Sequence, residues 1–491
     1  MDTNKAADSG KRGRGVLVIY TGGTIGMVHQ DSSNPLSPLV PGAWEELEAE
    51  FPQLKNFEFP VEGYQWKRPI DSSNIVPQDW IDIAQVIQDN YKKYQGFVIL
   101  HGTDTMAYTT AALSFLLESL TKPVIVTGSQ LPIAELRSDA AQNLITSIMM
   151  AAPESTSIPL IPEVCLFFRD KLYRGNRVRK ISSSGYSGFD SPNYSILGEA
   201  GEKIEINEKV INRVKTGLTE DDFYVHRSLD PNVASLEIFP GIQPNILKAI
   251  FDIEELKGVV LKTYGAGNTP TYPQFLEAIG YGVDKGKIII DVTQCNRGMV
   301  EIGLYEASAG LLDKGVVSGL DMTPEAALTK MGVLLGQGYN ANDVRNLMQI
   351  NQRGEQSMSI YNVEFKDGKA ELVFKYPPTK VSGDVDREKI NLANVRVQGV
   401  TLLESKEGEI SLSLFLNLPS ANEKTSENVP QFIGSRSQKW KKGDKLSLIF
   451  DATTATKRVF DPGRPVIISV ISRKDSPVVW ERLTFFIYES V

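Results

Sequence analysis

A short apolar run passes directly into a glycine-rich turn in the segment Val16-Leu17-Val18-Ile19-Tyr20-Thr21-Gly22-Gly23-Thr24-Ile25-Gly26. The same order recurs in Phe97-Val98-Ile99-Leu100-His101-Gly102-Thr103-Asp104-Thr105. Short apolar runs bounded by turn residues are typical of buried parallel strands, and ligands of open α/β sheets bind beyond the carboxyl ends of such strands. We therefore expect the hydroxyl groups of Thr24 and Thr103 to line one crevice as candidate nucleophiles.

The first part of the chain, residues 16–205, alternates apolar runs with helical patterns. The runs lie at 16–20, 97–101, 123–127 and 164–168, and the helical patterns lie near 79–94, 105–120 and 138–151. This alternation predicts a parallel α/β domain. One helix face is expected to be buried because its apolar residues recur at spacings of three and four: Trp80, Ile83, Ala84, Ile87 and Tyr91. Ser138 is the expected cap of the third helix.

The middle of the chain is predicted to hold a linker and a second α/β domain. Residues 206–231 are charged and weakly periodic, as expected for a linker. From residue 232 to 357 the alternation resumes, and Thr323-Pro324 is a suitable cap and first-turn pair for one of its helices. The expected strands lie around 258–263, 287–292 and 315–319. This second domain is the smaller of the two.

The last segment, residues 358–491, changes to a period of two, which is clearest over 410–418. Such alternation is typical of antiparallel strands with one buried face and predicts an all-β, sandwich-like domain. Further strands are expected at 445–450, 465–472 and 482–488, and the aromatic side chains are expected in the sheet core: Trp440, Phe450, Trp480, Phe485 and Phe486. No catalytic group is evident, and a docking or oligomerisation role is a hypothesis.

Composition favours a globular protein that acts on a small molecule. The chain has 491 residues, of which 41% are hydrophobic and 23% charged, so we expect two to four domains. The net charge of −8 provides no overall positive field for nucleic acid or an anionic membrane. The only cysteines, Cys165 and Cys295, support neither a disulfide framework nor a zinc site. We expect a cytoplasmic protein, whose residues 1–15 form a flexible tail with too few apolar residues for a signal peptide.

A threonine hydroxyl needs a neighbouring base before it becomes a strong nucleophile. Asp104 follows Thr103 directly, and Lys180 lies after the fourth predicted strand, also on the expected ligand edge. A lysine can act as a base when burial or nearby charges tune it. These groups are therefore candidates for activating a hydroxyl.

Other chemistries have weaker support. Taken alone, the glycine-rich turn is more typical of a tight connection or a phosphate cradle, but no dinucleotide fingerprint or P-loop occurs. No Gly-x-Ser-x-Gly elbow occurs either, and a Ser-His-Asp triad would have to use His29, His101 or His226. We interpret His101, beside Thr103, as a structural residue.

Taken together and in this order, the motifs resemble those of the asparaginase family, in particular its cytoplasmic type I branch. The matching segments are Tyr20–Gly26, Asp71–Ser73, His101–Ala107, Thr127–Gln130, Leu136–Asp139, Leu172–Arg177, Lys180, Gly265–Asn268 and Thr293–Cys295. The resemblance covers roughly residues 16–355. It implies two asparaginase-like parallel-sheet α/β domains and hydrolysis of L-asparagine to L-aspartate and ammonia, without a cofactor or metal.

The resemblance also implies catalytic roles. Thr24 attacks the side-chain amide carbon of asparagine and forms an acyl-enzyme, from which water releases aspartate. Lys180 polarises the hydroxyl of Thr103, while Asp104 steadies the lysine. Thr103 and Asp104 are also implied to contact the substrate, and Asp104 binds the amino group of the substrate. One departure is visible: where the family has a tyrosine that takes the proton of the first threonine, this chain has the segment 29–36 without a tyrosine.

Two further residues are implied to bind the substrate. Asp71 and Ser72 match positions that hold the α-amino and α-carboxylate groups, which charged hydrogen bonds recognise well. The alternative is that they form a loop turn or a helix cap before Pro77.

A second asparagine site is possible in type I relatives, and the matching residues here are Asn268, Thr293 and Cys295. An arginine is expected near Lys262, and lysine lacks the planar fork that binds a carboxylate through two hydrogen bonds. Allosteric activation is therefore in doubt, and Cys295 is alternatively an ordinary buried thiol.

Two other functions remain open. The chain also resembles the amidase subunit of a glutamyl-tRNA amidotransferase, although only about fifteen residues precede its first strand. A catalytically silent amino-acid-binding protein is the third possibility. The resemblance implies a homodimer or homotetramer because the family's sites lie near subunit contacts.

Overall fold

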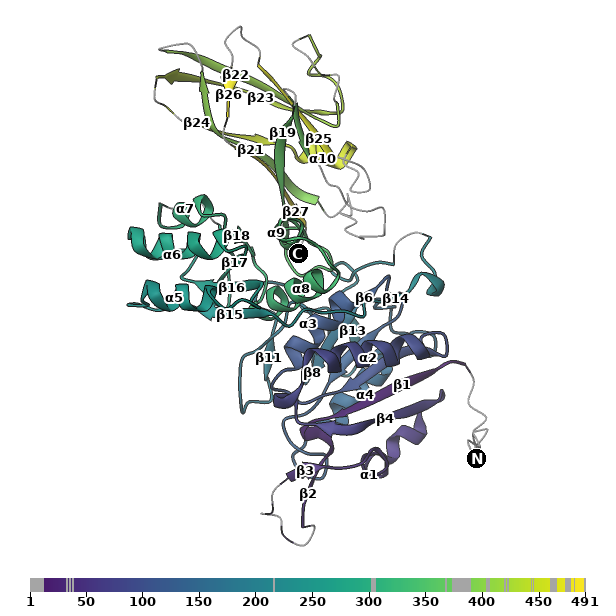
Figure 1. Cartoon of the computed structure of the whole chain (residues 1–491). Coiled ribbons are helices and arrows are strands. Elements are labelled where there is room, and N and C mark those ends of the chain that lie inside the picture. The colour runs from purple at the N-terminus through teal and green to yellow at the C-terminus, as the bar shows by residue number, and fades with distance from the viewer. Residues whose placement is uncertain are drawn as a thin grey trace. The chain divides into compact units, whose positions relative to one another are not determined.

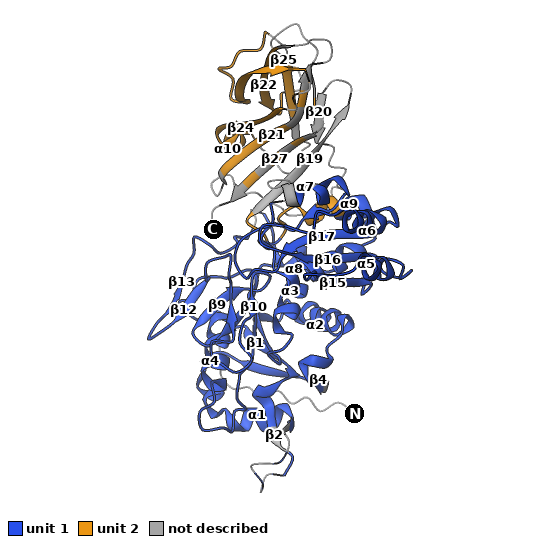
Figure 2. Ribbon diagram, turned by 90° about the vertical axis from the view of Figure 1, so that its left-hand side faces the viewer, with its two compact units in different colours: residues 1–344, 353–355 blue, residues 345–352, 356–491 orange. Residues whose placement is uncertain are grey.

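The computed structural model describes the chain apart from residues 1–12, 32–33, 35–36, 38, 215–216, 302–305, 367–368, 373–389, 403–406, 419–420, 422–423, 443, 445, 460–465, 473–477, 481 and 490–491. The chain divides into two compact units (Figure 2). The first unit contains residues 1–344 and 353–355, and the second contains residues 345–352 and 356–491. Both predicted α/β sheets lie in the first unit. The two units are described separately below.

The larger sheet of the first unit has eight strands in the order β13-β12-β9-β8-β7-β5-β1-β4. Neighbours from β8 to β4 pair in parallel, and the remaining pairs are antiparallel. The bounds are β1 Gly15–Gly22, β4 Val61–Ile70, β5 Tyr94–Leu100, β7 Val124–Thr127, β8 Val164–Phe168, β9 Lys171–Arg174, β12 Gly198–Ala200 and β13 Ile204–Ile206. The four predicted strands are thus β1, β5, β7 and β8. The predicted parallel α/β character is confirmed.

Both faces of this sheet are covered, which explains its continuous apolar strands. Leu17 and Ile19 of β1 pack against α2 and α3 on one face, whereas Val16 and Val18 pack against α1 and α4 on the other. Figure 1 shows these helices around the strands of the sheet. The helices are α1 Trp44–Glu50, α2 Pro77–Asn90, α3 Met106–Leu116 and α4 Ala140–Met150. All five residues of the predicted apolar face of α2 are buried, including Tyr91, which directly follows the helix.

Short elements complete this half of the first unit. Two-stranded ladders join β2 to β3, β6 to β14 and β10 to β11. Their bounds are β2 Met27–His29, β3 Leu39–Pro41, β6 Leu117–Glu118, β14 Tyr224–Val225, β10 Arg179–Lys180 and β11 Phe189–Asp190, and the 3-10 turns are η1 Thr24–Gly26, η2 Pro52–Asn56, η3 Ser72–Asn74 and η4 Glu220–Asp222. The predicted linker 206–231 therefore contains η4 and β14, and β14 contributes Val225 to the core.

The smaller sheet has four parallel strands in the order β15-β16-β17-β18. Its strands are β15 Val233–Glu237, β16 Gly258–Thr263, β17 Ile288–Thr293 and β18 Val317–Ser318, and its helices are α5 Pro244–Phe251, α6 Pro273–Asp284, α7 Glu306–Asp313 and α8 Pro324–Gly336. Helix α8 contacts both this sheet and α3, so it joins the two halves of the first unit. The hydroxyl of Thr323 accepts from the amide of Ala326 at 3.1 Å, as a cap should.

Helix capping differs from the prediction at α4. The N-cap residue is Asp139 rather than Ser138, although the Ser138 hydroxyl accepts from the amide of Ala140 at 3.1 Å. The Asp139 carboxylate accepts from the amide of Gln130 at 3.0 Å and from the side-chain amide of Asn143, in α4, at 3.1 Å. The helix thus begins one residue later than a Ser138 cap would place it, and Asp139 links its first turn to the loop that follows β7.

The second unit is built mainly from strands in the order β23-β22-β25-β20-β19-β27-β21-β24, with β26 beside β21. Its two end strands, β23 and β24, contact each other, so the sheet curls around one apolar core. The bounds are β19 Met358–Lys366, β20 Lys369–Leu372, β21 Ile390–Leu402, β22 Glu407–Leu416, β23 Phe432–Lys441, β24 Leu446–Asp451, β25 Val466–Ser472, β26 Val478–Val479 and β27 Arg482–Glu489, and the helix is α10 Thr453–Val459. Helix α9, Ala341–Met348, is divided between the units after residue 344. The predicted β-rich character is confirmed, with α10 as an addition.

The aromatic residues of the second unit behave largely as predicted. Trp440, Phe450 and Phe485 are buried in the core, and Trp480 packs against it. The side chain of Phe486 lies outside the described residues. Throughout the described ranges, each helix is too short or too polar to span a membrane.

Candidate active site

Three neighbouring strands end at one edge of the larger sheet and carry most of the predicted site. Strand β1 lies between β4 and β5 and pairs in parallel with both. The turns that follow them hold Thr24 after β1, Ser72 after β4 and Thr103 after β5. Parallel strands place their carboxyl ends at the same edge, so polar residues far apart in the sequence converge there.

Close backbone contacts show how tightly these turns meet. Gly23 has a φ of +90°, and a methyl group on it would lie 2.4 Å from the amide nitrogen of Gly102. A methyl group on Gly102 would lie 2.5 Å from the hydroxyl oxygen of Ser72. Only glycine permits these approaches, so the glycines of both motifs serve to bring Thr24, Ser72 and Thr103 together.

Lys180 joins this edge from β10. Its Nζ donates to Thr103 Oγ1 at 2.9 Å and to Asp104 Oδ1 at 2.6 Å. The lysine side chain is 18% exposed and the Asp104 side chain 65% exposed, so the amine is sheltered while the carboxylate faces solvent. A neutral amine in this position would accept the hydroxyl proton of Thr103, and the carboxylate would stabilise the resulting ammonium.

Thr24 is the first residue of η1 and is half-buried. At the end of the same turn, the Tyr20 hydroxyl lies 3.3 Å from the carbonyl oxygen of Gly26, and it lies 3.3 Å from that of Gly42. Burial, and secondarily the charge of Glu46, raises the pKa of Tyr20 to about 12, so its hydroxyl stays protonated and donates. The sequence analysis did not identify Tyr20 as a residue that supports the Thr24 turn. The segment 29–36, which lacks the family tyrosine, lies partly outside the described residues.

Asp71 and Ser72 have structural partners in addition to their position at the edge. Asp71 is exposed and caps η3, since its Oδ1 accepts from the amide of Ser73 at 2.9 Å. Ser72 is buried, and its carbonyl accepts from the Thr105 hydroxyl at 2.8 Å. The capping alternative therefore applies to Asp71. One carboxylate oxygen makes the cap, which leaves the other available for a ligand.

His101 is a structural residue, as predicted. Its Nδ1 lies 2.6 Å from the Gly102 carbonyl, which only accepts, so Nδ1 carries the proton. Its Nε2 then accepts from the Thr109 hydroxyl at 2.9 Å, and that hydroxyl accepts from Trp80 Nε1 at 2.9 Å. Complete burial lowers the pKa of His101 to about 4, so the imidazole is neutral and holds the turn before Thr103.

The residues predicted for a second site follow neighbouring strands of the smaller sheet. Asn268 forms a bridge with Tyr264 just after β16, and Thr293 ends β17. The Thr293 hydroxyl accepts from the amide of Cys295 at 3.0 Å. Cys295 is exposed, so the interpretation of a buried thiol is wrong, because the turn after β17 carries it to the surface.

Lys262 already has an anionic partner near this second site. Its Nζ donates to the carboxylate of Glu237, the residue opposite it on β15. A ligand carboxylate would have to compete with Glu237 for that ammonium. Among the described residues, no three His, Cys, Asp or Glu side chains gather into a possible metal site.

Asp291 of β17 gives a pH prediction. It is completely buried, its Oδ1 accepts from the Thr263 hydroxyl at 2.7 Å, and burial raises its pKa to about 8. Between pH 4 and 8 the folded protein keeps a proton that the unfolded chain releases, so stability falls as pH rises. We expect Asp291→Asn to gain about 1–3 kcal/mol over wild type at pH 9 and much less at pH 5.

Melting temperatures of both proteins at the two pH values test this prediction. The exposed Asp82→Asn on α2 is the control and should show no such trend. A gain for Asp291→Asn that is equal at both pH values would contradict the buried, protonated carboxyl.

The fold and the site define an α/β protein that gathers two threonines, carboxylates and an amine at one sheet edge, and a hydroxyl beside an amine is a combination that can support nucleophilic catalysis. Residues 15–212 match the asparaginase N-terminal domain, and residues 232–348 match the glutaminase/asparaginase C-terminal domain. The chain belongs to the asparaginase family. The predicted resemblance is thereby confirmed, and residues 358–491 lie beyond both matches.

Three relatives illustrate this membership. L-asparaginase 1 of Escherichia coli K12 is 41% identical over 343 residues, which are 70% of this chain and 98% of the relative. The crystal structure of L-asparaginase I from Vibrio cholerae, also 41% identical, gives a TM-score of 0.62 and covers 70% of this chain and 99% of its own. A glutamyl-tRNA(Gln) amidotransferase component of Pyrococcus abyssi is 32% identical over 69% of this chain and 76% of that relative.

Proposed function

We propose that this protein is an L-asparaginase that hydrolyses L-asparagine to L-aspartate and ammonia. The observation that carries this proposal is the contact of Lys180 with both Thr103 and Asp104, beside the turn that bears Thr24. Similarity to proteins named L-asparaginase at 41% identity supports the choice of substrate.

The proposed reaction has two steps. The hydroxyl oxygen of Thr24 bonds to the amide carbon of the substrate, the carbon–nitrogen bond breaks, and the hydroxyl proton leaves with the nitrogen as ammonia. Water then attacks the ester, using Thr103 with Lys180 as the base, and returns the proton to Thr24 as aspartate is released. Asp104 stabilises the lysine while it carries the proton.

Substrate binding is proposed to use the neighbouring turns. The free oxygen of Asp71 and the side chain of Asp104 would bind the α-amino group, and Ser72 the α-carboxylate, with Thr103 against the amide. Asn268, Thr293 and Cys295 are proposed as a regulatory site, although the contact between Lys262 and Glu237 weakens its case for a carboxylate ligand.

Domain organisation, location and assembly are proposed on the same basis. The proposed domains are 16–205 and 232–357, joined by 206–231 and followed by the β-rich module 358–491. We propose a cytoplasmic homodimer or homotetramer, and the mass of the purified full chain by light scattering would decide between these states.

Release of ammonia by the purified full-length protein tests the function. We expect ammonia and aspartate from L-asparagine, with L-glutamine disfavoured by about 10- to 200-fold because a pocket distinguishes one methylene only that well. Ammonia from glutamine only with a partner and charged tRNA would instead favour the amidotransferase function. Tight asparagine binding without turnover would favour a silent binding protein.

A further inference from the structure

Arg177 lies three residues before Lys180 and is tied to two groups that are distant in the sequence. Its Nε donates to the Gly354 carbonyl at 2.6 Å, and its Nη1 donates to Asp321 Oδ2 at 2.7 Å. The Arg177 side chain is 1% exposed and that of Asp321 5% exposed. The proposed reaction gives neither residue a role, so this buried ion pair needs another explanation.

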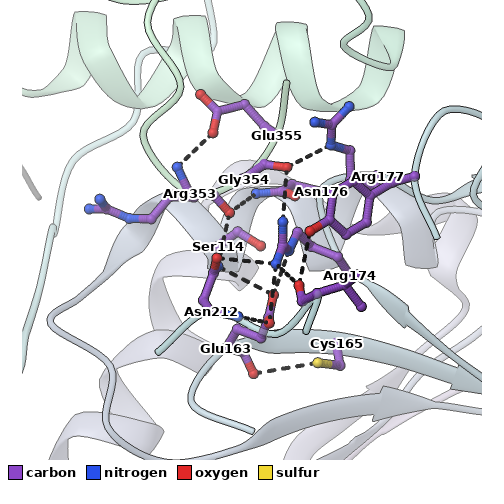
Figure 3. Close-up of polar contacts among 12 residues, drawn as sticks. Ser114, Glu163, Cys165, Arg174, Asn176, Arg177, Asn212, Arg353, Gly354 and Glu355 are labelled. Atoms are coloured by element: carbon purple, nitrogen blue, oxygen red, sulfur yellow. Dashed lines mark hydrogen bonds and ion pairs between the residues drawn. The ribbon is translucent and has the colours of Figure 1, made fainter. Parts of the chain in front are cut away.

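Gly354 belongs to a short segment, Arg353–Glu355, that we call the strap (Figure 3). The Asn176 side-chain amide donates to the Arg353 carbonyl at 3.1 Å, and Arg174 Nη1 lies 3.5 Å from the Gly354 carbonyl. A methyl group on Gly354, whose φ is +80°, would lie 2.2 Å from that Nη1. The loop of residues 174–177 therefore packs directly on the strap backbone.

The strap is itself fixed by buried charges. Glu355 pairs with Lys330 of α8 at 2.6 Å, and both side chains are fully buried. Arg353 pairs with the buried carboxylate of Glu118. The strap is thus held in place by two ion pairs with buried carboxylates.

Arg179, directly before Lys180, is held by residues of the smaller α/β half. Arg179 Nη1 donates to Asn296 at 2.9 Å, and Arg179 Nε lies 3.4 Å from Glu325. Segment 174–180 is therefore fastened at both ends. Because Lys180 must lie within hydrogen-bond distance of Thr103, small displacements of this segment change the geometry of the reacting groups.

We propose that Arg177 is a positioning residue, which sets the distance between the Lys180 amine and the Thr103 hydroxyl by holding segment 174–180 against the strap and Asp321. This inference rests on the proposed function. Arginine suits the task because its planar fork donates in two directions at once, which the single ammonium of a lysine cannot do in a fixed geometry.

The test compares Arg177→Lys with wild type in the full-length chain. We expect kcat for ammonia release to fall by about 10- to 100-fold while KM changes by less than about threefold, since a displacement of about 1 Å can cost that much in rate. Asp321→Asn, which keeps a similar shape, should lower kcat in the same way but less, and it serves if Arg177→Lys does not fold.

A double-variant cycle separates positioning from general destabilisation. In a Lys180→Met background, Arg177→Lys should lower the remaining rate by less than about twofold, because the group that it positions is gone. Lys122→Arg is the control and should keep the wild-type kcat. Lys122 is also a buried cation and donates to the Tyr91 and Tyr94 carbonyls, but it lies just before β7, at the amino ends of the parallel strands.

Two results would overturn the inference. One is an unchanged kcat in folded Arg177→Lys and Asp321→Asn, and the other is an equal loss from Arg177→Lys with and without Lys180. In both cases wild-type activity stands, so the proposed function survives. A wild-type protein that releases no ammonia would instead overturn the proposed function, and this inference with it.

Discussion

Replacing Lys180 by methionine is expected to lower kcat for ammonia release by a factor of about 10² to 10⁴, the usual contribution of a positioned general base. Methionine keeps the length and apolar stem of lysine but has no amine to accept the Thr103 proton. The fold should survive, because Lys180 makes its described side-chain contacts with Thr103 and Asp104 at the sheet edge. Steady-state assays on L-asparagine, with far-ultraviolet circular dichroism as a check on folding, measure this effect.

Lys93→Met is the matched control for Lys180→Met. Lys93 also pairs with a carboxylate, that of Glu62 at 2.8 Å, but it lies just before β5, at the amino end of the strand. It should keep the wild-type rate. Near-normal turnover in Lys180→Met would remove the lysine from the mechanism, and wild-type rates in Thr24→Ala would remove Thr24 as the nucleophile.

Replacing Glu355 by glutamine is expected to lower the free energy of unfolding by about 3–5 kcal/mol, because it leaves the buried ammonium of Lys330 without its carboxylate. Burial alone would raise the pKa of Glu355, but the Lys330 ammonium holds it below its ordinary value, so the carboxylate is charged. Chemical unfolding of wild type and variant measures the loss.

Two comparisons sharpen the Glu355 prediction. Glu62→Gln breaks an exposed pair and should cost about 1 kcal/mol or less. The double variant Lys330→Met with Glu355→Leu should recover part of the loss, since apolar groups can replace a buried ion pair. A loss below about 1 kcal/mol for Glu355→Gln would show that the pair is not buried as described.

Much of the fold could be predicted from local patterns. The run 164–168 coincides with β8, and the pair Thr323-Pro324 caps and begins α8. The alternation over 410–418 lies largely within β22. These elements are readable because burial of one face leaves a period of two or 3.6 in the sequence itself.

The candidate site could be predicted only in part. The ordered motifs indicated Thr24, Thr103, Asp104 and Lys180, and the structure brings Lys180 to Thr103 and Asp104. Residues with a supporting role were missed, among them Tyr20, whose hydroxyl lies 3.3 Å from the carbonyl oxygens of Gly26 and Gly42. No sequence pattern pairs Glu355 with Lys330, although their buried side chains lie 2.6 Å apart in the structure.

By itself, the sequence determined the strands, their helices and the glycine-bounded strand ends, because backbone sterics and the burial of neighbouring side chains act over a few residues. Only the tertiary structure decided which distant charges meet. Lys180 contacts Asp104 across 76 positions, and Arg177 contacts Gly354 across 177. Such pairs leave no period in the chain, since packing of whole sheets and helices, rather than local preference, brings their atoms within hydrogen-bond distance.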